Sequence, residues 1–119
     1  MSLFVYGIPT CSTCSNARKW LDAQSIAYTW INTRESAPTV IQITKWVEDI
    51  GSKAMKNTSG GSYRALGDEK NSWNDAQWIQ AFAHDPMLLK RPIFVHDGRA
   101  LCAGFKKEGE ERIKKIAKK

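Results

Sequence analysis

Near the N-terminus, two cysteines lie between an apolar run and an amphipathic segment, in the stretch LFVYGIPTCSTCSNARKWL. Residues 3–7 are apolar, rich in β-forming side chains and closed by a glycine, which predicts a buried strand. Apolar residues then recur with helical spacing over residues 15–24. Cys11 and Cys14 are therefore expected in a strand-to-helix turn and in the first turn of the helix.

The next segments predict a strand, two helices and a long loop. Residues 27–32 alternate and contain aromatic and β-branched side chains, so they complete a strand–helix–strand unit whose strands should be parallel. Residues 38–51 have helical spacing and end at a glycine. Residues 57–72 are dense in Gly, Ser and Asn and predict a loop. A further helix is expected over residues 73–85, with Ser72 or Asn74 as its cap.

The C-terminal third predicts a hairpin followed by a helix. Two apolar runs in RPIFVHDGRALCAGF are joined by Asp97-Gly98, the strongest short hairpin signal. From Lys106 onward the pattern is helical. The whole order is that of an α/β, thioredoxin-like fold, a mixed β-sheet with flanking helices. It forms one domain of residues 1–119, with a helical insertion of about residues 38–85 after the second strand.

The position of the cysteine pair favours redox chemistry. The thiolate is the reactive form of cysteine, and the unpaired N–H groups and dipole of a helix N-terminus stabilise that anion. Cys11 is expected at that N-terminus and is interpreted as the nucleophile. Cys14, one turn further on, can attack a mixed disulfide on Cys11 and is interpreted as the resolving thiol. Arg18 and Lys19 are nearby cations.

Two other interpretations of the pair are weaker. A zinc site needs two further ligands, and the remaining candidates, Cys102, His84 and His96, form no second closely spaced pair. We therefore expect no metal. A pair of inert buried cysteines fits poorly with the polar turn PTCSTCSN. Cys102 falls in a predicted strand and is interpreted as a small core residue.

Charge and composition limit the class of protein. The chain has 119 residues, a formal net charge of +6 and only three cysteines, too few for a secreted disulfide scaffold. No apolar run is long enough to span a bilayer. We expect a cytoplasmic monomer without a membrane partner. Much of the basic charge lies in the last helix and favours no sequence-specific nucleic-acid binding.

Three stretches, YGIPTCSTCSNARKWL, NTSGGSYRAL and LLKRPIFVHDGRALCAGF, together resemble the ArsC/Spx family of the thioredoxin superfamily. The resemblance covers nearly the whole chain. It implies a cis peptide bond before Pro92 and an active site between Cys11, the helix start and Arg91, with Cys11, Cys14 and Arg91 as catalytic residues. The positions implied for substrate binding are Thr13, Ser15, Asn16, Arg18, Ser59, Arg64 and Pro92.

Arsenate reductases of this family use one nucleophilic cysteine, matched by Cys11, and take electrons from glutathione through glutaredoxin. They hold the oxyanion with three arginines, of which Arg91 matches one. The other two positions fall near Ser59 and Ala103, where no arginine stands, and Arg64 is the candidate to replace the first. An anion of multiple charge needs several charge-assisted hydrogen bonds. Arsenate reduction is therefore the disfavoured alternative.

Spx-type regulators carry a C-x-x-C switch, matched here by Cys11 and Cys14, and bind the C-terminal domain of the RNA polymerase α subunit. Their pattern has a basic residue after the second cysteine, whereas this chain has Ser15. The favoured expectation is a thiol-disulfide redox protein in which Arg91 anchors an anionic group. It would bind no cofactor and use glutathione, glutaredoxin or a thioredoxin-type protein as partner. A polymerase-binding regulator is the alternative.

Overall fold

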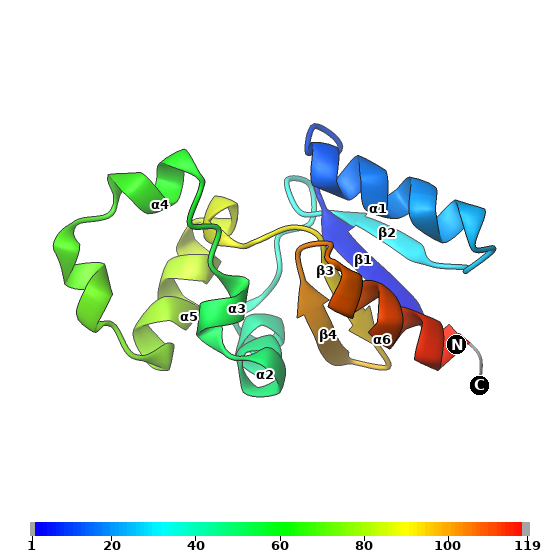
Figure 1. Cartoon of the computed structure of the whole chain (residues 1–119). Helices are drawn as coiled ribbons and strands as arrows, with labels where there is room; N and C mark the ends of the chain where they lie inside the picture. Colours follow the sequence, from blue (N-terminus) through cyan, green and yellow to red (C-terminus); the bar gives the residue numbers. More distant parts are fainter. Residues whose placement is uncertain (1, 118–119) are drawn as a thin grey trace.

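The computed structural model describes residues 2–117, so Met1 and residues 118–119 of the predicted domain lie outside the described residues. These residues form one four-stranded sheet in the order β2-β1-β3-β4 (Figure 1). Strands β1 and β2 are parallel, and β3 pairs antiparallel with β1 and β4. The strands are β1 (Leu3–Gly7), β2 (Thr29–Asn32), β3 (Ile93–His96) and β4 (Arg99–Ala103). The predicted α/β, thioredoxin-like fold is confirmed, including the parallel pair and the hairpin.

The β3–β4 hairpin turns through two residues. Asp97 and Gly98 have φ angles of +50° and +83°, the left-handed conformations that a tight two-residue turn requires at both positions. Strand β4 carries one extra residue where the register shifts between Phe94 and Val95. The Asp-Gly signal in the sequence therefore located this turn.

Helices cover both faces of the sheet. Alternate residues of β1 face opposite sides, as a pleated strand requires. Leu3 and Val5 pack with α1 (Ser12–Ala23) and α6 (Lys107–Ala117) in one cluster, whereas Phe4 and Tyr6 pack on the cluster that contains α2 (Val40–Ile50). Cys11 thus begins a helix that is anchored along one side of the sheet.

The insertion lies between β2 and β3, as predicted, and contains more helix than expected. Besides α2 it comprises α3 (Ser52–Met55), α4 (Gly61–Ala65), α5 (Asp75–His84) and the 3₁₀ turns η1 (Asp68–Ser72) and η2 (Pro86–Leu88). The prediction of a loop over residues 57–72 was wrong, because α4 and η1 occupy much of it. Tyr63 of α4 stacks on Trp78 with ring centroids 6.1 Å apart. This long-range contact outweighs the weak helix propensity of a Gly- and Ser-rich segment.

Local capping fixes the ends of the two longer insertion helices. Of the two predicted caps of α5, Asn74 is the one used. Its side chain accepts the N–H of Gln77 at 2.9 Å, and the Gln77 side chain accepts the N–H of Asn74 at 2.8 Å, which makes a reciprocal capping box. Helix α2 runs from Val40 to Ile50, and its C-cap is Gly51, whose φ of +85° suits only glycine.

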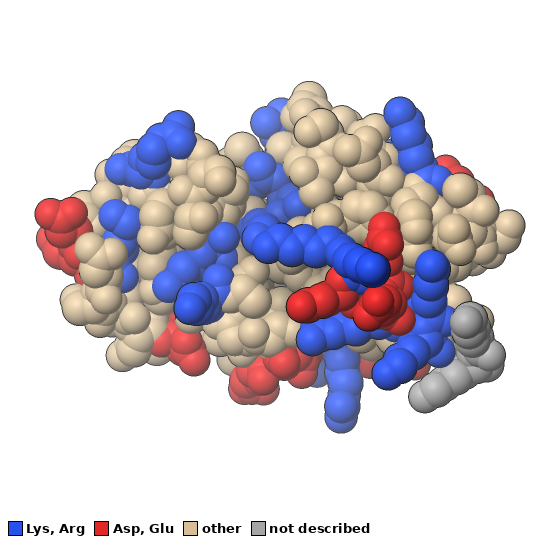
Figure 2. Space-filling model, in the orientation of Figure 1, with Lys and Arg blue, Asp and Glu red and all other residues tan. Residues whose placement is uncertain are grey.

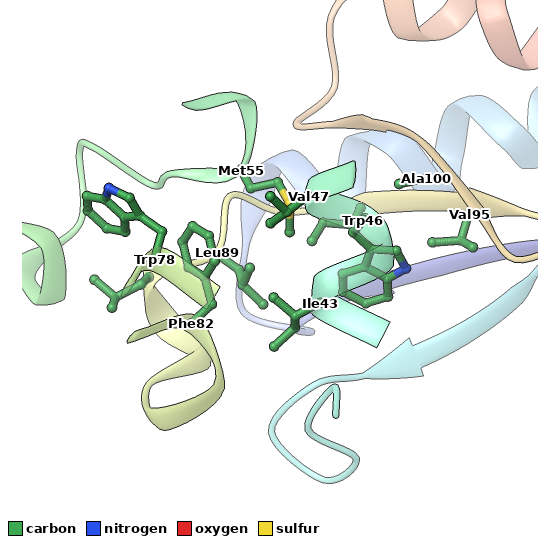
Figure 3. Packing of buried hydrophobic residues seen from close by; sticks show 11 residues of the cluster. Ile43, Trp46, Val47, Met55, Trp78, Phe82, Leu89, Val95 and Ala100 are labelled. Carbon is green, nitrogen blue, oxygen red and sulfur yellow. The ribbon is translucent and has the colours of Figure 1, made fainter. Parts of the chain in front are cut away.

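One apolar cluster joins the insertion to the sheet. Figure 3 shows Trp78, Phe82 and Leu89 leading into the side chains of α2 and then to the sheet residues. Its buried members are Ile43, Trp46, Val47, Met55, Trp78, Phe82, Leu88, Leu89, Ile93, Val95 and Ala100. The segment 89–92, which carries Arg91, is therefore held between two packed parts. No helix within residues 2–117 is long and apolar enough to cross a membrane.

Candidate active site

Cys11 occupies the N-cap position of α1, with an extended backbone (φ −90°, ψ 120°). Its carbonyl accepts the N–H of Ser15 at 3.0 Å, the first bond of the helix. The Cys11 side chain is half-buried. The backbone N–H groups of Thr13 and Cys14 lie near its sulfur and favour its anion, although the Cys11 side chain makes no capping hydrogen bond. These are two of the donors that a helix start leaves without intrahelical partners.

The surroundings of Cys11 favour its thiolate. Burial opposes ionisation, but the N–H and thiol of Cys14, the N–H of Thr13 and the charge of Arg91 outweigh it. Together they hold the pKa of Cys11 below its usual range. The thiolate is the nucleophilic form. Cys11 therefore has the chemistry of an attacking thiol.

Cys14 has the opposite character. Its side chain is 1% exposed, and burial, aided by the nearby Cys11 sulfur, raises the pKa of Cys14 to about 12. The sulfur lies against Gly7, where an added Cβ would stand 2.6 Å from it and 2.9 Å from the Trp30 ring. Only glycine leaves room for both groups. Both cysteines are free thiols, and the nearby Cys14 thiol helps to lower the pKa of Cys11.

Arg91 faces the cysteine pair from the segment before β3. The Arg91–Pro92 peptide bond is cis, as the family resemblance implied. The guanidinium Nη1 donates to the carbonyls of Leu89 at 3.1 Å and Met87 at 3.4 Å. Its Nε is buried and has no acceptor among residues 2–117. Leaving a buried donor unpaired is costly, so the Arg91 Nε still lacks a hydrogen-bond acceptor.

A pocket of about 340 Å³ opens beside Cys11 and Arg91. It is also lined by Thr13, Asn57, Ser59, Lys90, Gly104, Phe105 and Lys106. Three of these groups are cations: one guanidinium and two ammonium groups. Lys90 and Lys106 were not identified as pocket residues from the sequence. Lys90 directly precedes Arg91-Pro92, and Lys106 directly follows Gly104-Phe105, so both adjoin motifs that carry the family resemblance.

The structure does not bring all of the candidate site residues into this pocket. Thr13, Ser59 and Arg91 line it with Cys11, and Pro92 is buried beside Arg91. Ser15 instead lines a separate pocket of about 230 Å³ behind Cys14. Asn16 is exposed on α1 and lines neither pocket.

The two remaining candidate arginines, Arg18 and Arg64, do not line the pocket beside Cys11. Arg18 lines the pocket behind Cys14, donates to the Tyr28 hydroxyl at 3.3 Å and stacks 4.4 Å above the Trp30 ring. Arg64 is exposed and donates to the carbonyl of Ser59 at 2.7 Å. Arg64 does not line the pocket beside Cys11, although Ser59 does.

The other metal-ligand candidates are dispersed. Cys102 lies on β4 against Gly109, and burial raises the pKa of Cys102 to about 11. His96 Nε2 lies 3.4 Å from an Asp97 carboxylate oxygen, and His84 is exposed at the end of α5. Within residues 2–117, no three His, Cys, Asp or Glu side chains are grouped to hold a metal ion.

Comparison with known proteins agrees with this geometry. The family model described as ArsC family matches residues 6–113, nearly the whole chain. This protein belongs to the ArsC family. The YusI protein of Bacillus subtilis is 33% identical over 112 residues, covering 91% of this chain and 94% of its own. A crystal structure from Bacteroides fragilis, of an ArsC family related protein, has a TM-score of 0.84 at 32% identity and covers 95% of this chain and 98% of its own.

Relatives of two functional kinds occur among the matches. The global transcriptional regulator Spx of Lactiplantibacillus plantarum is 24% identical over 117 residues, covering 93% of this chain and 85% of the regulator. An arsenate reductase of Acidiphilium multivorum is 28% identical over 104 residues, covering 85% and 74%. Membership of the family therefore supports a thiol redox protein or an Spx-like regulator.

The pH at which Cys11 becomes reactive toward alkylation should depend on the charge of Arg91. We expect the rate of iodoacetamide modification at Cys11 to rise with pH at a midpoint below that of an ordinary thiol, because the pKa of Cys11 is lowered. Arg91→Gln removes one stabilising charge and should move the midpoint upward, whereas Arg91→Lys should move it less. Arg64→Gln is the matched control and should leave it unchanged. A profile of Arg91→Gln identical to the wild type would contradict the role of this charge.

Proposed function

We propose that the protein is a thiol-disulfide oxidoreductase that acts on small disulfides, with Cys11 as nucleophile, Cys14 as resolving thiol and glutathione as reductant. One observation carries the proposal. Cys11, whose pKa is lowered, stands at a helix start beside the buried, protonated Cys14, and Cys11 lines a pocket with three cations. Such a difference in pKa separates the attacking thiol from the resolving thiol.

The reaction begins at Cys11. Its thiolate attacks one sulfur of the substrate disulfide, so a bond forms between Cys11 and that half and the other half leaves as a thiolate. The Cys14 thiol passes its proton to solvent or to the departing sulfur and attacks Cys11. A Cys11–Cys14 disulfide forms, and the second thiol leaves. Two electrons move from the protein to the substrate, and two glutathione molecules return them, becoming glutathione disulfide.

Arg91 supports this reaction at two points. Its charge stabilises the Cys11 thiolate, and its unpaired Nε is a donor for an anionic group of the substrate. A carboxylate is the matching acceptor, since charge-assisted hydrogen bonds to guanidinium are strong. Lys90 and Lys106 add positive charge on the same pocket wall.

A coupled assay tests the proposal. Bis(2-hydroxyethyl) disulfide is supplied with glutathione, glutathione reductase and NADPH, and NADPH oxidation is followed. We expect wild-type protein to raise the rate above the uncatalysed exchange. Cys14→Ser should accumulate a mixed disulfide on Cys11 that is visible by mass, because the resolving thiol is absent. No acceleration together with an unmodified Cys11 would contradict the proposal.

A redox switch for transcription is the second candidate, because Spx regulators match over more than nine tenths of this chain. In that case the Cys11–Cys14 disulfide would change binding to the C-terminal domain of the RNA polymerase α subunit. A pull-down with that domain, on reduced and on oxidised protein, decides this point. No binding in either state excludes the switch.

Arsenate reduction is less well supported by the pocket. Arg91 is its one guanidinium, and Lys90 and Lys106 are point charges that do not offer the paired donors of arginine. With glutathione, glutaredoxin, glutathione reductase and NADPH present, we expect no arsenate-dependent oxidation of NADPH. A clear arsenate-dependent rate would show that the lysines replace the missing arginines.

A further inference from the structure

A second pocket adjoins the one that holds Cys11. It has a volume of about 430 Å³, and Lys90 and Lys106 line both pockets. Because the two pockets share these residues, they are neighbours, and the second lies along the edge strand β4. The other residues that line the second pocket are Asp49, Ile50, Ala54, Cys102, Ala103, Glu108 and Arg112.

The second pocket contains charges of both signs. Lys90, Lys106 and Arg112 are cations, and Asp49 and Glu108 are carboxylates. Within residues 2–117, none of these five makes an ion pair within 4.0 Å. Figure 2 shows basic side chains across the middle of this face, with acidic ones beside them over the start of α6. Groups of opposite charge therefore line the same pocket without forming ion pairs with one another.

The backbone of β4 holds two of these charged groups in place. An Asp49 carboxylate oxygen, from α2, accepts the N–H of Ala100 at 2.9 Å. Arg112, from α6, donates through Nη1 to the carbonyl of Leu101 at 2.6 Å. Helices α2 and α6 cover opposite faces of the sheet, so an anion and a cation are fixed on either side of its edge strand. A preorganised pair of this kind lowers the cost of binding a ligand.

We propose that this second pocket is a subsite for the zwitterionic end, an ammonium and a carboxylate on one carbon, of a small peptide thiol whose sulfur reacts with Cys11. The γ-glutamyl end of glutathione has this chemistry. Asp49 and Glu108 take the ammonium, and Lys90, Lys106 and Arg112 take the carboxylate. The inference rests on the proposed function and names the part of the substrate that lies away from the sulfur.

Size and charge favour this occupant over others. An extended tripeptide spans about 10 Å, and each pocket is within the volume range of small-ligand sites. A ligand with carboxylates alone would leave Asp49 and Glu108 facing negative charge. An apolar ligand would cover five charged groups, of which, among the described residues, only Asp49 and Arg112 have hydrogen-bond partners, both in the backbone of β4.

The test isolates the first step in the full-length Cys14→Ser protein. The rate of mixed-disulfide formation on Cys11 is measured with two substrates. One is glutathione disulfide. The other is its analogue in which glutaryl groups replace the γ-glutamyl groups, so that it lacks only the ammonium groups. We expect the ratio of the two rates to fall about fivefold in Asp49→Asn and in Glu108→Gln. Glu111→Gln, on the same helix but outside the pocket, is the matched control and should keep the ratio.

The outcomes separate the subsite from the chemistry. A ratio that neither Asp49→Asn nor Glu108→Gln changes would overturn the subsite. The subsite would also be overturned if both variants slowed exchange with a disulfide-bonded protein while the ratio of the two rates stayed constant. That result would indicate a protein-docking surface. If Cys11 reacts with neither glutathione disulfide nor bis(2-hydroxyethyl) disulfide, the proposed function itself is overturned, and the subsite falls with it.

Discussion

Replacing Cys11 with serine should abolish disulfide reduction, lowering the coupled rate by more than about a thousandfold. The hydroxyl of serine stays protonated at neutral pH, so the two N–H donors and Arg91 would have no thiolate to stabilise. The loss should appear with every disulfide substrate, because Cys11 takes part in the first bond-forming step. The rate of NADPH oxidation in the glutathione-coupled assay measures it.

The matched control is Cys102→Ser. Cys102 is a half-buried thiol on β4 whose pKa is raised to about 11, so it supplies no thiolate and its loss should leave the coupled rate within about twofold. Full activity in Cys11→Ser would contradict the role of Cys11 as nucleophile. Equal losses in both variants would show that activity depends on something other than the thiolate at Cys11.

Phe82→Ala should lower the free energy of unfolding by about 3–5 kcal/mol. Phe82 is fully buried on α5 and packs with Trp78, with ring centroids 5.6 Å apart, in the cluster that joins the insertion to the sheet. Removing its ring leaves a cavity that the neighbouring side chains only partly fill. Urea unfolding followed by circular dichroism measures the change.

Ile41→Ala is the control for this prediction. Ile41 lies on α2 and is 73% exposed, so its truncation should change the free energy of unfolding by no more than about 0.5 kcal/mol. A loss below about 1 kcal/mol in Phe82→Ala would contradict the packing shown in Figure 3. A separate early transition of the insertion would show that it unfolds independently of the sheet.

Much of the fold follows from short-range patterns in the sequence. The glycine-closed apolar run of residues 3–7, the Asp97-Gly98 turn and the spacing of α2 each contain their signal within a few residues. The helices α4 and η1 carry no such signal. Helix α4 is held by Tyr63 packing against Trp78, a contact between segments that only the tertiary structure brings together.

The candidate site, like the fold, could be predicted from the sequence only in part. A C-x-x-C between a strand and a helix predicts the place of Cys11 because a helix start always leaves free N–H groups. The roles of the arginines could not be read from the sequence, since Arg18 is engaged by Tyr28 and Trp30 and Arg64 by the Ser59 carbonyl. Lys106 joins Cys11 only through the fold of the chain.

A titration of the protein against glutathione redox buffers shows directly whether Cys11 and Cys14 act as a redox pair. Free thiols are trapped with a mass-tagged maleimide, and the mass of the peptide that carries Cys11 and Cys14 is read at each potential. We expect a reversible internal disulfide that forms within the cytosolic range of potentials. A glutathione adduct on Cys11 that persists while Cys14 stays free would contradict a resolving role for Cys14. It would leave single-cysteine chemistry in its place.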